Sequence, residues 1–215
     1  CVAVMVEPIQ GEGGVVVPND GYLRDLRRLC DVKDALLIVD EVQSGIGRTG
    51  KWFGYQHEDI LPDVVTSAKA LGNGVPIGAC LARGIAATIL SPGTHGSTFG
   101  GNPLACSAAL AVLDVVNEKN LLERSRLLGN FFATAFQKKL ADRNEVMEVR
   151  GKGLMVGIEL DRPCGELVKI CSSRGVLINV AAQNVVRLLP PLIITDDQAT
   201  EIVENVSASI FDFLD

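Results

Sequence analysis

The 215-residue sequence has little of several residue types that mark particular classes of protein. It contains only two histidines, and its six cysteines form no Cys-x-x-Cys pair, so neither a zinc site nor a disulfide framework is indicated. Its 20 lysines and arginines are outnumbered by 26 aspartates and glutamates, which argues against nucleic acid as a partner, because phosphate binding needs surplus basic residues. No apolar run approaches the ~20 residues of a membrane-spanning helix, so we expect no membrane partner.

Apolar residues make up 47% of the chain and charged residues 21%, which is typical of a folded protein. The apolar, β-branched runs at 2–6 and 36–39 predict buried strands, and apolar residues at helical spacing predict a helix between them. Strand, helix and strand in this order predict a βαβ unit with a parallel strand pair. Because a buried strand at the first residues needs neighbours, we expect the chain to be a fragment.

A shift in composition near residue 120 predicts two domains, 1–120 and 121–215. We expect the first to be an α/β domain and the second a smaller α+β domain. The first also contains expected strands at 64–67 and 78–82 and an expected helix at 103–116. The second contains an expected amphipathic helix at 121–140, strands at 146–149, 154–160, 176–180 and 185–189, a helix near 166–173, and a last helix that opens with the capping pattern Thr195-Asp196-Asp197-Gln198.

A glycine-rich stretch at 45–50 matches the G-x-G-x-x-G spacing of dinucleotide-binding loops. In that fold the loop opens a helix whose N-terminus holds the pyrophosphate. Here Lys51-Trp52-Phe53 follows, which is a poor helix start, and Trp52 stands where a P-loop would need serine or threonine. We therefore do not interpret this stretch as a nucleotide site.

Asp40 and Lys69 are the residues from which chemistry can be argued directly. Asp40 follows a predicted parallel strand, and ligands of open α/β sheets bind at the carboxyl ends of the strands. Lys69 lies among small residues that leave room for a large ligand at its amine. Taken singly, the two are ordinary as a loop-capping carboxylate and a surface lysine. Together they match the needs of pyridoxal 5′-phosphate (PLP), which takes an amine at its aldehyde and a carboxylate at its ring nitrogen.

Five ordered blocks carry the strongest pattern in the sequence: 7–12 (EPIQGE), 40–50 (DEVQSGIGRTG), 67–79 (SAKALGNGVPIGA), 95–103 (HGSTFGGNP) and 184–192 (NVVRLLPPL). Together they resemble the class III aminotransferases. The resemblance implies a fold-type I PLP-dependent transferase, of which this chain would be the C-terminal part: an incomplete, mainly parallel sheet of the large domain, followed by a small α+β domain. Class III enzymes are about twice this length, and the parts that their N-terminal half supplies are missing here.

The resemblance implies roles for the residues that would hold the cofactor. Lys69 would form the Schiff base and move the substrate proton, and Asp40 would pair with the pyridinium nitrogen. Val42 would pack on one face of the ring, and Gln43 would bind its phenolic oxygen. Thr98, with Ser97 beside it, would reach the cofactor phosphate of the other subunit, which implies a homodimer with shared active sites. The alternative for Ser97 is that it only shapes its loop.

The resemblance also implies how the substrate is held. Arg187 would bind a substrate carboxylate, for which its planar fork is suited. Glu12 would pair with Arg187 while the ω-amino substrate is bound and move away when glutamate needs this arginine. The alternative is that Arg187 faces solvent from an edge strand.

Within the class, the blocks are most similar to the bacterial members that move the δ-amino group of N2-acetylornithine to 2-oxoglutarate. Such an enzyme would be a cytoplasmic protein of arginine biosynthesis. Transamination of ornithine or of 4-aminobutyrate is the alternative inside the class. A catalytically incomplete piece that acts only in assembly is the alternative outside it.

Overall fold

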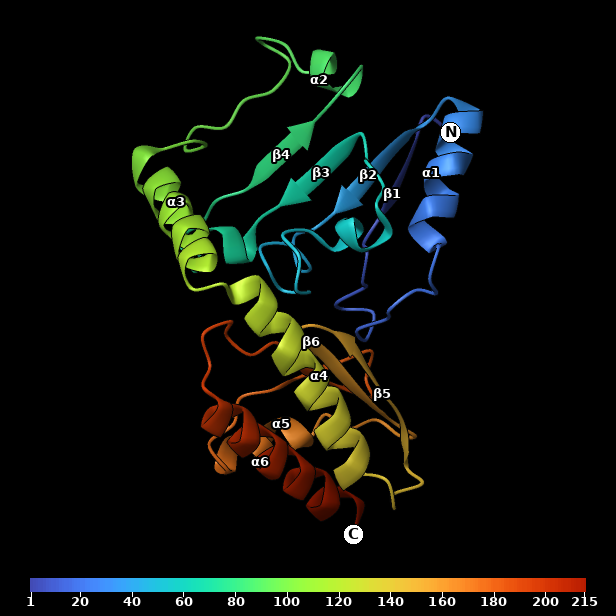
Figure 1. The fold of residues 1–215 in the computed structure, drawn as a ribbon, viewed down its shortest axis with the longest axis vertical. Helices are drawn as coiled ribbons and strands as arrows, with labels where there is room; N and C mark the ends of the chain where they lie inside the picture. Colours follow the sequence, from blue (N-terminus) through green and yellow to red (C-terminus); the bar gives the residue numbers. More distant parts are fainter. The chain divides into compact units, whose positions relative to one another are not determined.

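The computed structural model describes all 215 residues, whose elements Figure 1 labels in chain order. The chain forms two compact units, which are described separately here. Unit 1 comprises Cys1–Pro8 and Pro18–Leu122, and unit 2 comprises Ile9–Val17 and Glu123–Asp215. The short segment at 9–17 therefore belongs with residues more than a hundred positions further along the chain.

Unit 1 is built on a four-stranded sheet in the order β1-β2-β3-β4. The first three strands are parallel and β4 runs antiparallel to β3 (Figure 1), which confirms the predicted mainly parallel sheet and its βαβ start. Residues facing the interior from β2 pack against one side of the connecting helix, whose Leu23 and Cys30 are buried. The elements are β1 (Ala3–Val6), α1 (Tyr22–Lys33), β2 (Leu36–Asp40), β3 (Val64–Ser67) and β4 (Ala79–Ala82).

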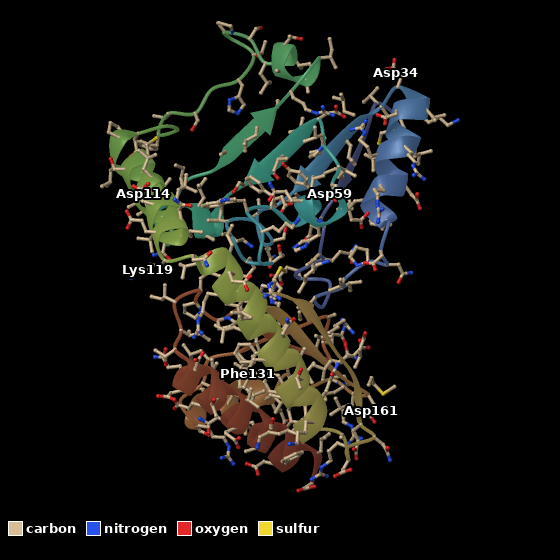
Figure 2. All side chains as sticks on the ribbon, in the orientation of Figure 1. Asp34, Asp59, Asp114, Lys119, Phe131 and Asp161 are labelled. Carbon is tan, nitrogen blue, oxygen red and sulfur yellow. The ribbon has the colours of Figure 1, made fainter.

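The local sequence explains where the helices of unit 1 begin and end. Helix α1 ends before Asp34, labelled in Figure 2, which adopts the left-handed conformation common after a helix. Helix α3 (Pro103–Glu118) begins with proline in its first turn, and the Asn102 side chain accepts a hydrogen bond from the Ala105 N–H. Three short helices were not predicted, η1 (Gly54–Glu58), η2 (Lys69–Leu71) and α2 (Ala86–Ile89). No α-helix opens after the 45–50 stretch, which agrees with rejecting a dinucleotide loop.

Unit 2 contains a four-stranded antiparallel sheet in the order β5-β6-β8-β7. Its last helix begins with the predicted capping box, in which the side chain of Thr195 accepts from the Gln198 N–H and the Gln198 side chain accepts from the Thr195 N–H. The elements are α4 (Leu121–Lys139, which begins in unit 1), β5 (Val146–Lys152), β6 (Met155–Leu160), α5 (Leu167–Ser173), β7 (Asn179–Ala181), β8 (Val185–Leu188) and α6 (Asp196–Leu214).

The predicted strand at 176–180 is wrong in position. Val176 is buried, but its N–H donates to the Cys171 carbonyl and so closes the end of α5 instead of joining a sheet. Gly175, with φ of 80°, makes the turn after this helix. Strand β7 starts only at Asn179, so the apolar run at 176–178 placed the predicted strand three residues too early.

The main core of unit 2 is a cluster of nineteen buried residues, most of them from α4, α5, α6 and the sheet, beside a small cluster of Ile9, Val15 and Met155. Phe132 and Phe136 of α4 are fully buried and stack with their ring centroids 6.0 Å apart. None of the helices of the chain combines the length and the apolar character that crossing a membrane requires.

Candidate active site

Asp40 and Lys69 lie at the same edge of the unit 1 sheet. Strands β2 and β3 are parallel, and Asp40 stands opposite Thr66 in their register. Lys69 follows Thr66 by three residues, directly after the end of β3. Because the carboxyl ends of parallel strands meet at one edge, the acid and the amine belong to adjacent strand ends.

Hydrogen bonds hold the Asp40 carboxylate by one of its two oxygens. Its Oδ1 accepts from the Val42 N–H at 2.9 Å and from the Thr66 hydroxyl at 3.1 Å. The side chain is half-buried. Both bonds go to Oδ1, so Oδ2 keeps its capacity to accept a proton donor from a ligand.

Lys69 occupies an unusual backbone position. Its φ is 45°, in the left-handed region that residues other than glycine adopt rarely. Its carbonyl accepts from the Gly72 N–H at 3.1 Å, and a Cβ on Gly72 would lie 2.0 Å from the Val75 carbonyl, so only glycine fits this turn. The Lys69 side chain is exposed. Such local strain is typical of functional positions, where it is held by the surrounding structure.

Glu41, next to Asp40, is buried and organises the loop that follows β2. Its carboxylate accepts from the Ser44 hydroxyl at 2.6 Å and from the backbone N–H groups of Gly54 and Tyr55, each at 2.8 Å. Burial raises the pKa of this carboxyl, against the opposing effect of the three hydrogen bonds. This role could not be predicted from the sequence, because an acidic residue at a strand end gives no sign of being buried.

The other residues expected to contact the cofactor lie in two loops of unit 1. Val42 and Gln43 are partly buried in the loop organised by Glu41. Ser97 and Thr98 lie in the long segment between α2 and α3 (Figure 1), where both are exposed. The neighbouring Phe99 is 81% exposed, so this segment presents an aromatic side chain to its surroundings.

Arg187 lies within the unit 2 sheet and not at its edge. It belongs to β8, which pairs with β6 on one side and β7 on the other. Its side chain is only 7% exposed, so the alternative of a solvent-facing arginine on an edge strand is wrong. The Arg187 Nη1 lies 2.8 Å from Oε1 of Glu12, whose side chain is 70% exposed. The two residues predicted to bind and gate a carboxylate are therefore an ion pair.

The residues of the β2–β3 edge fit PLP. An exposed amine is available for an aldehyde, and a fixed carboxylate has one free oxygen for a protonated ring nitrogen. A third polar group is present on β3, where the Ser67 hydroxyl is buried without a hydrogen-bond partner. A buried hydroxyl with no partner is unusual and is explained most simply by a further polar group beside it.

Comparison with known proteins shows the family of this chain. The aminotransferase class-III family matches residues 1–210. The acetylornithine aminotransferase of Nitrosomonas europaea is 51% identical over 214 residues, which are 100% of this chain and 54% of that protein. The chain thus spans about half the length of the curated relatives it matches.

Two solved structures have the same fold. The acetylornithine aminotransferase of Elizabethkingia anophelis superposes with a TM-score of 0.91 at 43% identity, covering 98% of this chain and 57% of that one. An ornithine aminotransferase of Toxoplasma gondii, described as holding PLP at partial occupancy, superposes with a TM-score of 0.93 at 40% identity, covering 98% and 50%. The chain belongs to the class III aminotransferases, a PLP-dependent family, and its fold matches the C-terminal half of their structures.

Proposed function

We propose that the chain is the C-terminal half of an aminotransferase that moves the δ-amino group of N2-acetylornithine to 2-oxoglutarate. The products are N-acetylglutamate 5-semialdehyde and glutamate. The observation that carries the proposal is the placement of Asp40 and Lys69 at adjacent carboxyl ends of parallel strands. The relatives at about 50% identity are named acetylornithine aminotransferases, which supports the choice of substrate.

In the proposed reaction, PLP supplies an electron sink for the electron pair left when the substrate C–H bond breaks. Lys69 would hold the cofactor through Nζ, and its amine would move the proton at the substrate carbon that bears nitrogen. Asp40 would keep the ring nitrogen protonated through its Oδ2. Its Oδ1 is already fixed by Val42 and Thr66, so the carboxylate needs no rearrangement to act.

The remaining proposed cofactor contacts come from three loop residues and one neighbour. Val42 packs on a face of the ring, and Gln43 binds its phenolic oxygen. Thr98, with Ser97 beside it, binds the cofactor phosphate of a second subunit. The exposure of Ser97 and Thr98 supports this arrangement, because side chains that serve a partner subunit are open to solvent in a single chain. We therefore propose a homodimer with shared active sites.

Arg187 is proposed to bind the carboxylate of 2-oxoglutarate or glutamate. A buried arginine fork pairs strongly with a carboxylate because little of its charge is screened by water. Glu12 neutralises Arg187 when the acylated amino donor, which carries its reacting amine at the other end, is bound. Exchange of Glu12 for a substrate carboxylate lets one site accept both substrates in turn.

Ornithine is the second candidate donor, since ornithine aminotransferases superpose on this chain with TM-scores up to 0.94. 4-Aminobutyrate is the third. We place the acetylornithine enzyme in the cytoplasm and in arginine biosynthesis, as the resemblance implies. A piece that acts only in assembly would show no turnover in any partnered form.

The test is a chimera that joins the N-terminal half of the Nitrosomonas europaea enzyme to this chain. Its kcat/KM is measured with N2-acetylornithine, ornithine and 4-aminobutyrate, each with 2-oxoglutarate. We expect N2-acetylornithine to be preferred by at least about ten-fold. A preference for either other donor would replace the proposed substrate. No turnover by a dimeric, PLP-loaded chimera would favour the assembly role.

A further inference from the structure

The segment at 9–17 forms a small hairpin in unit 2 that carries Glu12. Gln10 and Val16 exchange two backbone hydrogen bonds of 3.1 and 3.0 Å, which close the hairpin. The ion pair between Glu12 and Arg187 joins the hairpin to the sheet. The two side chains differ in burial, because Glu12 is 70% exposed while Arg187 is 7% exposed. The Glu12 side chain can therefore move into solvent while Arg187 stays in place. The position of the hairpin affects the fraction of time for which the two residues are paired.

The hairpin lies on the sheet between two arginines. Arg150 of β5 and Arg187 of β8 both stand opposite Gly157 of β6 in the strand register. Residues directly opposite one another in antiparallel strands point to the same face of a sheet. A Cβ on Gly157 would lie 3.0 Å from the Cβ of Val15, so the absent side chain makes the space that the hairpin fills.

Arg150 binds the backbone of this hairpin directly. Its Nη2 donates to the Gly14 carbonyl at 2.8 Å, and its Nε donates to the Gly14 and Val15 carbonyls at 3.2 and 3.1 Å. Its Nη1 pairs with Glu148 at 2.7 Å and with Glu159. The two carboxylates hold the guanidinium in place. The guanidinium in turn holds the carbonyls of Gly14 and Val15, which lie two and three residues after Glu12.

The backbone that Arg150 holds is strained. Val15 is fully buried and has φ of 52°, a left-handed conformation that a β-branched residue very rarely adopts. A strained residue persists only where its surroundings determine its conformation. Here the surroundings are the packing of Val15 over the sheet and the guanidinium of Arg150, so losing the guanidinium contacts would let this part of the hairpin relax.

We propose that Arg150 is a positioning residue that holds the 9–17 hairpin so that Glu12 closes the carboxylate site of Arg187. The inference rests on the proposed function, in which Arg187 binds carboxylates and Glu12 competes with them. Without the Arg150 contacts, Glu12 would pair with Arg187 less often. The site would then favour the substrate that carries a carboxylate for Arg187 and disfavour the acylated amino donor.

The test uses Arg150→Lys, which keeps the positive charge beside Glu148 and Glu159 but cannot hold two carbonyls with a planar fork. It is compared with Glu12→Gln, which removes the carboxylate that competes with a ligand carboxylate for Arg187, and with the double variant. Arg162→Lys is the matched control, because Arg162 pairs with the neighbouring Asp161 and contacts no part of the hairpin. The probe is glutarate, a dicarboxylate without a reacting carbonyl, whose Kd for the chain is measured by titration calorimetry.

We expect Glu12→Gln and Arg150→Lys each to lower the glutarate Kd, by about five-fold or more. Because both act on the same competition, the double variant should stay within about two-fold of Glu12→Gln alone. Arg162→Lys should match wild type. An unchanged Kd in Arg150→Lys, or effects that multiply in the double variant, would show that Arg150 does not act through Glu12.

A second variant keeps the test decisive if Arg150→Lys fails to fold. Gly14→Ala disturbs the same hairpin with Arg150 intact, since Gly14 has φ of 103° and an added Cβ would lie 3.1 Å from Cγ2 of Val185. It should shift the glutarate Kd in the same direction, and an unchanged Kd would contradict the role of the hairpin.

Arg187→Gln separates this inference from the proposed function. If Arg187→Gln leaves glutarate binding unchanged, or if Glu12→Gln binds no glutarate, the carboxylate role of Arg187 is wrong and both proposals fail. If Arg187→Gln weakens binding while Arg150→Lys has no effect, only the positioning role fails. In the active chimera, Arg150→Lys should lower KM for 2-oxoglutarate and raise KM for the amino donor, with kcat changed less than either.

Discussion

The two units bury their apolar residues to very different extents. The main core cluster of unit 2 contains nineteen buried residues, whereas the largest cluster in unit 1 contains six. Around β4, α2 and α3, unit 1 leaves large apolar side chains open, among them Phe99 at 81% and Leu104 at 75% exposed. Open apolar surface of this kind is typical of surfaces that contact other proteins.

This difference in burial corresponds to different expected roles for the two units. In unit 2 the carboxylate-binding candidate, Arg187, stands in the middle of a sheet backed by a complete core, which suits precise recognition. In unit 1 the acid and the amine stand at strand ends of a sheet with exposed apolar surroundings. We therefore expect changes in unit 1 to affect chemistry and assembly, and changes in unit 2 to affect recognition and stability.

The largest effect is expected from Asp40→Asn in unit 1. Asparagine can still accept from Val42 and Thr66 through its carbonyl oxygen, but it carries no negative charge to hold a proton on the ring nitrogen. In the active chimera kcat should fall by about 10²–10⁴-fold with PLP still bound. The control is Asp34→Asn, at an exposed position whose left-handed backbone asparagine tolerates. Turnover near wild type would refute the role of Asp40.

Phe132→Ala tests the core of unit 2. Phe132 is fully buried, so its truncation should lower the free energy of unfolding by about 3–5 kcal/mol. The neighbouring Phe131, labelled on α4 in Figure 2, is 38% exposed, and Phe131→Ala should cost about 1 kcal/mol or less. Denaturant unfolding followed by circular dichroism measures both. Equal losses would show that unit 2 does not depend on this core.

Asp63→Asn tests whether the stability of unit 1 depends on ion pairs rather than on a large apolar core. The Asp63 Oδ2 accepts from the Leu37 N–H at 2.8 Å and from Arg27 Nη1 at 2.6 Å. Burial alone would raise the pKa of Asp63, but these bonds outweigh it and lower the pKa below its ordinary value. The native carboxylate therefore stabilises unit 1 above about pH 4, and this contribution is lost as the pH falls further through the lowered pKa.

The measurement for Asp63 is hydrogen exchange in β2 as a function of pH. Wild type should lose protection on acidification, and Asp63→Asn should be less protected at neutral pH, by about 1.5–3 kcal/mol, with a flatter acid dependence. Strand β6 of unit 2 serves as the internal reference. The same acid dependence in both proteins would exclude Asp63 as its source.

The smallest effect is expected at the capping box of α6. Thr195→Ala removes the acceptor for the Gln198 N–H and should lower the free energy of unfolding by about 1 kcal/mol. Thr200→Ala, within the same helix, is the control, since its hydroxyl bonds only to the Asp196 carbonyl within the helix. The same thermal unfolding in Thr195→Ala as in wild type would mean that the cap is not needed.

Much of the fold could be predicted because its signals are local. The apolar runs placed β2 and β3 to within a residue, and the capping box of α6 was predicted from Thr195 and Gln198. The misplaced strand at 176–180 shows the limit. Val176 is buried at the end of α5, and Leu177, next to it, is 88% exposed, so the apolar run at 176–178 does not mark a strand.

The residues of the candidate site likewise differ in whether local sequence predicts them. Asp40 and Lys69 could be found because their neighbours in sequence create the pattern. Arg150 and the burial of Glu41 could not be found, because both depend on contacts between distant segments. Arg150 contacts Gly14, 136 positions earlier in the chain. An arginine in a strand carries no local sign of such a partner.

The most direct test of the central claim is to incubate the chain with PLP, reduce it with borohydride and locate the label by peptide mass spectrometry. The experiment is done on the chain alone and in the chimera, with Lys69→Ala and the control Lys51→Ala, whose amine bonds to the Gln56 carbonyl. We expect a stoichiometric label on Lys69 in the chimera, lost in Lys69→Ala and kept in Lys51→Ala. A label on another lysine, or one that survives Lys69→Ala, would contradict this expectation.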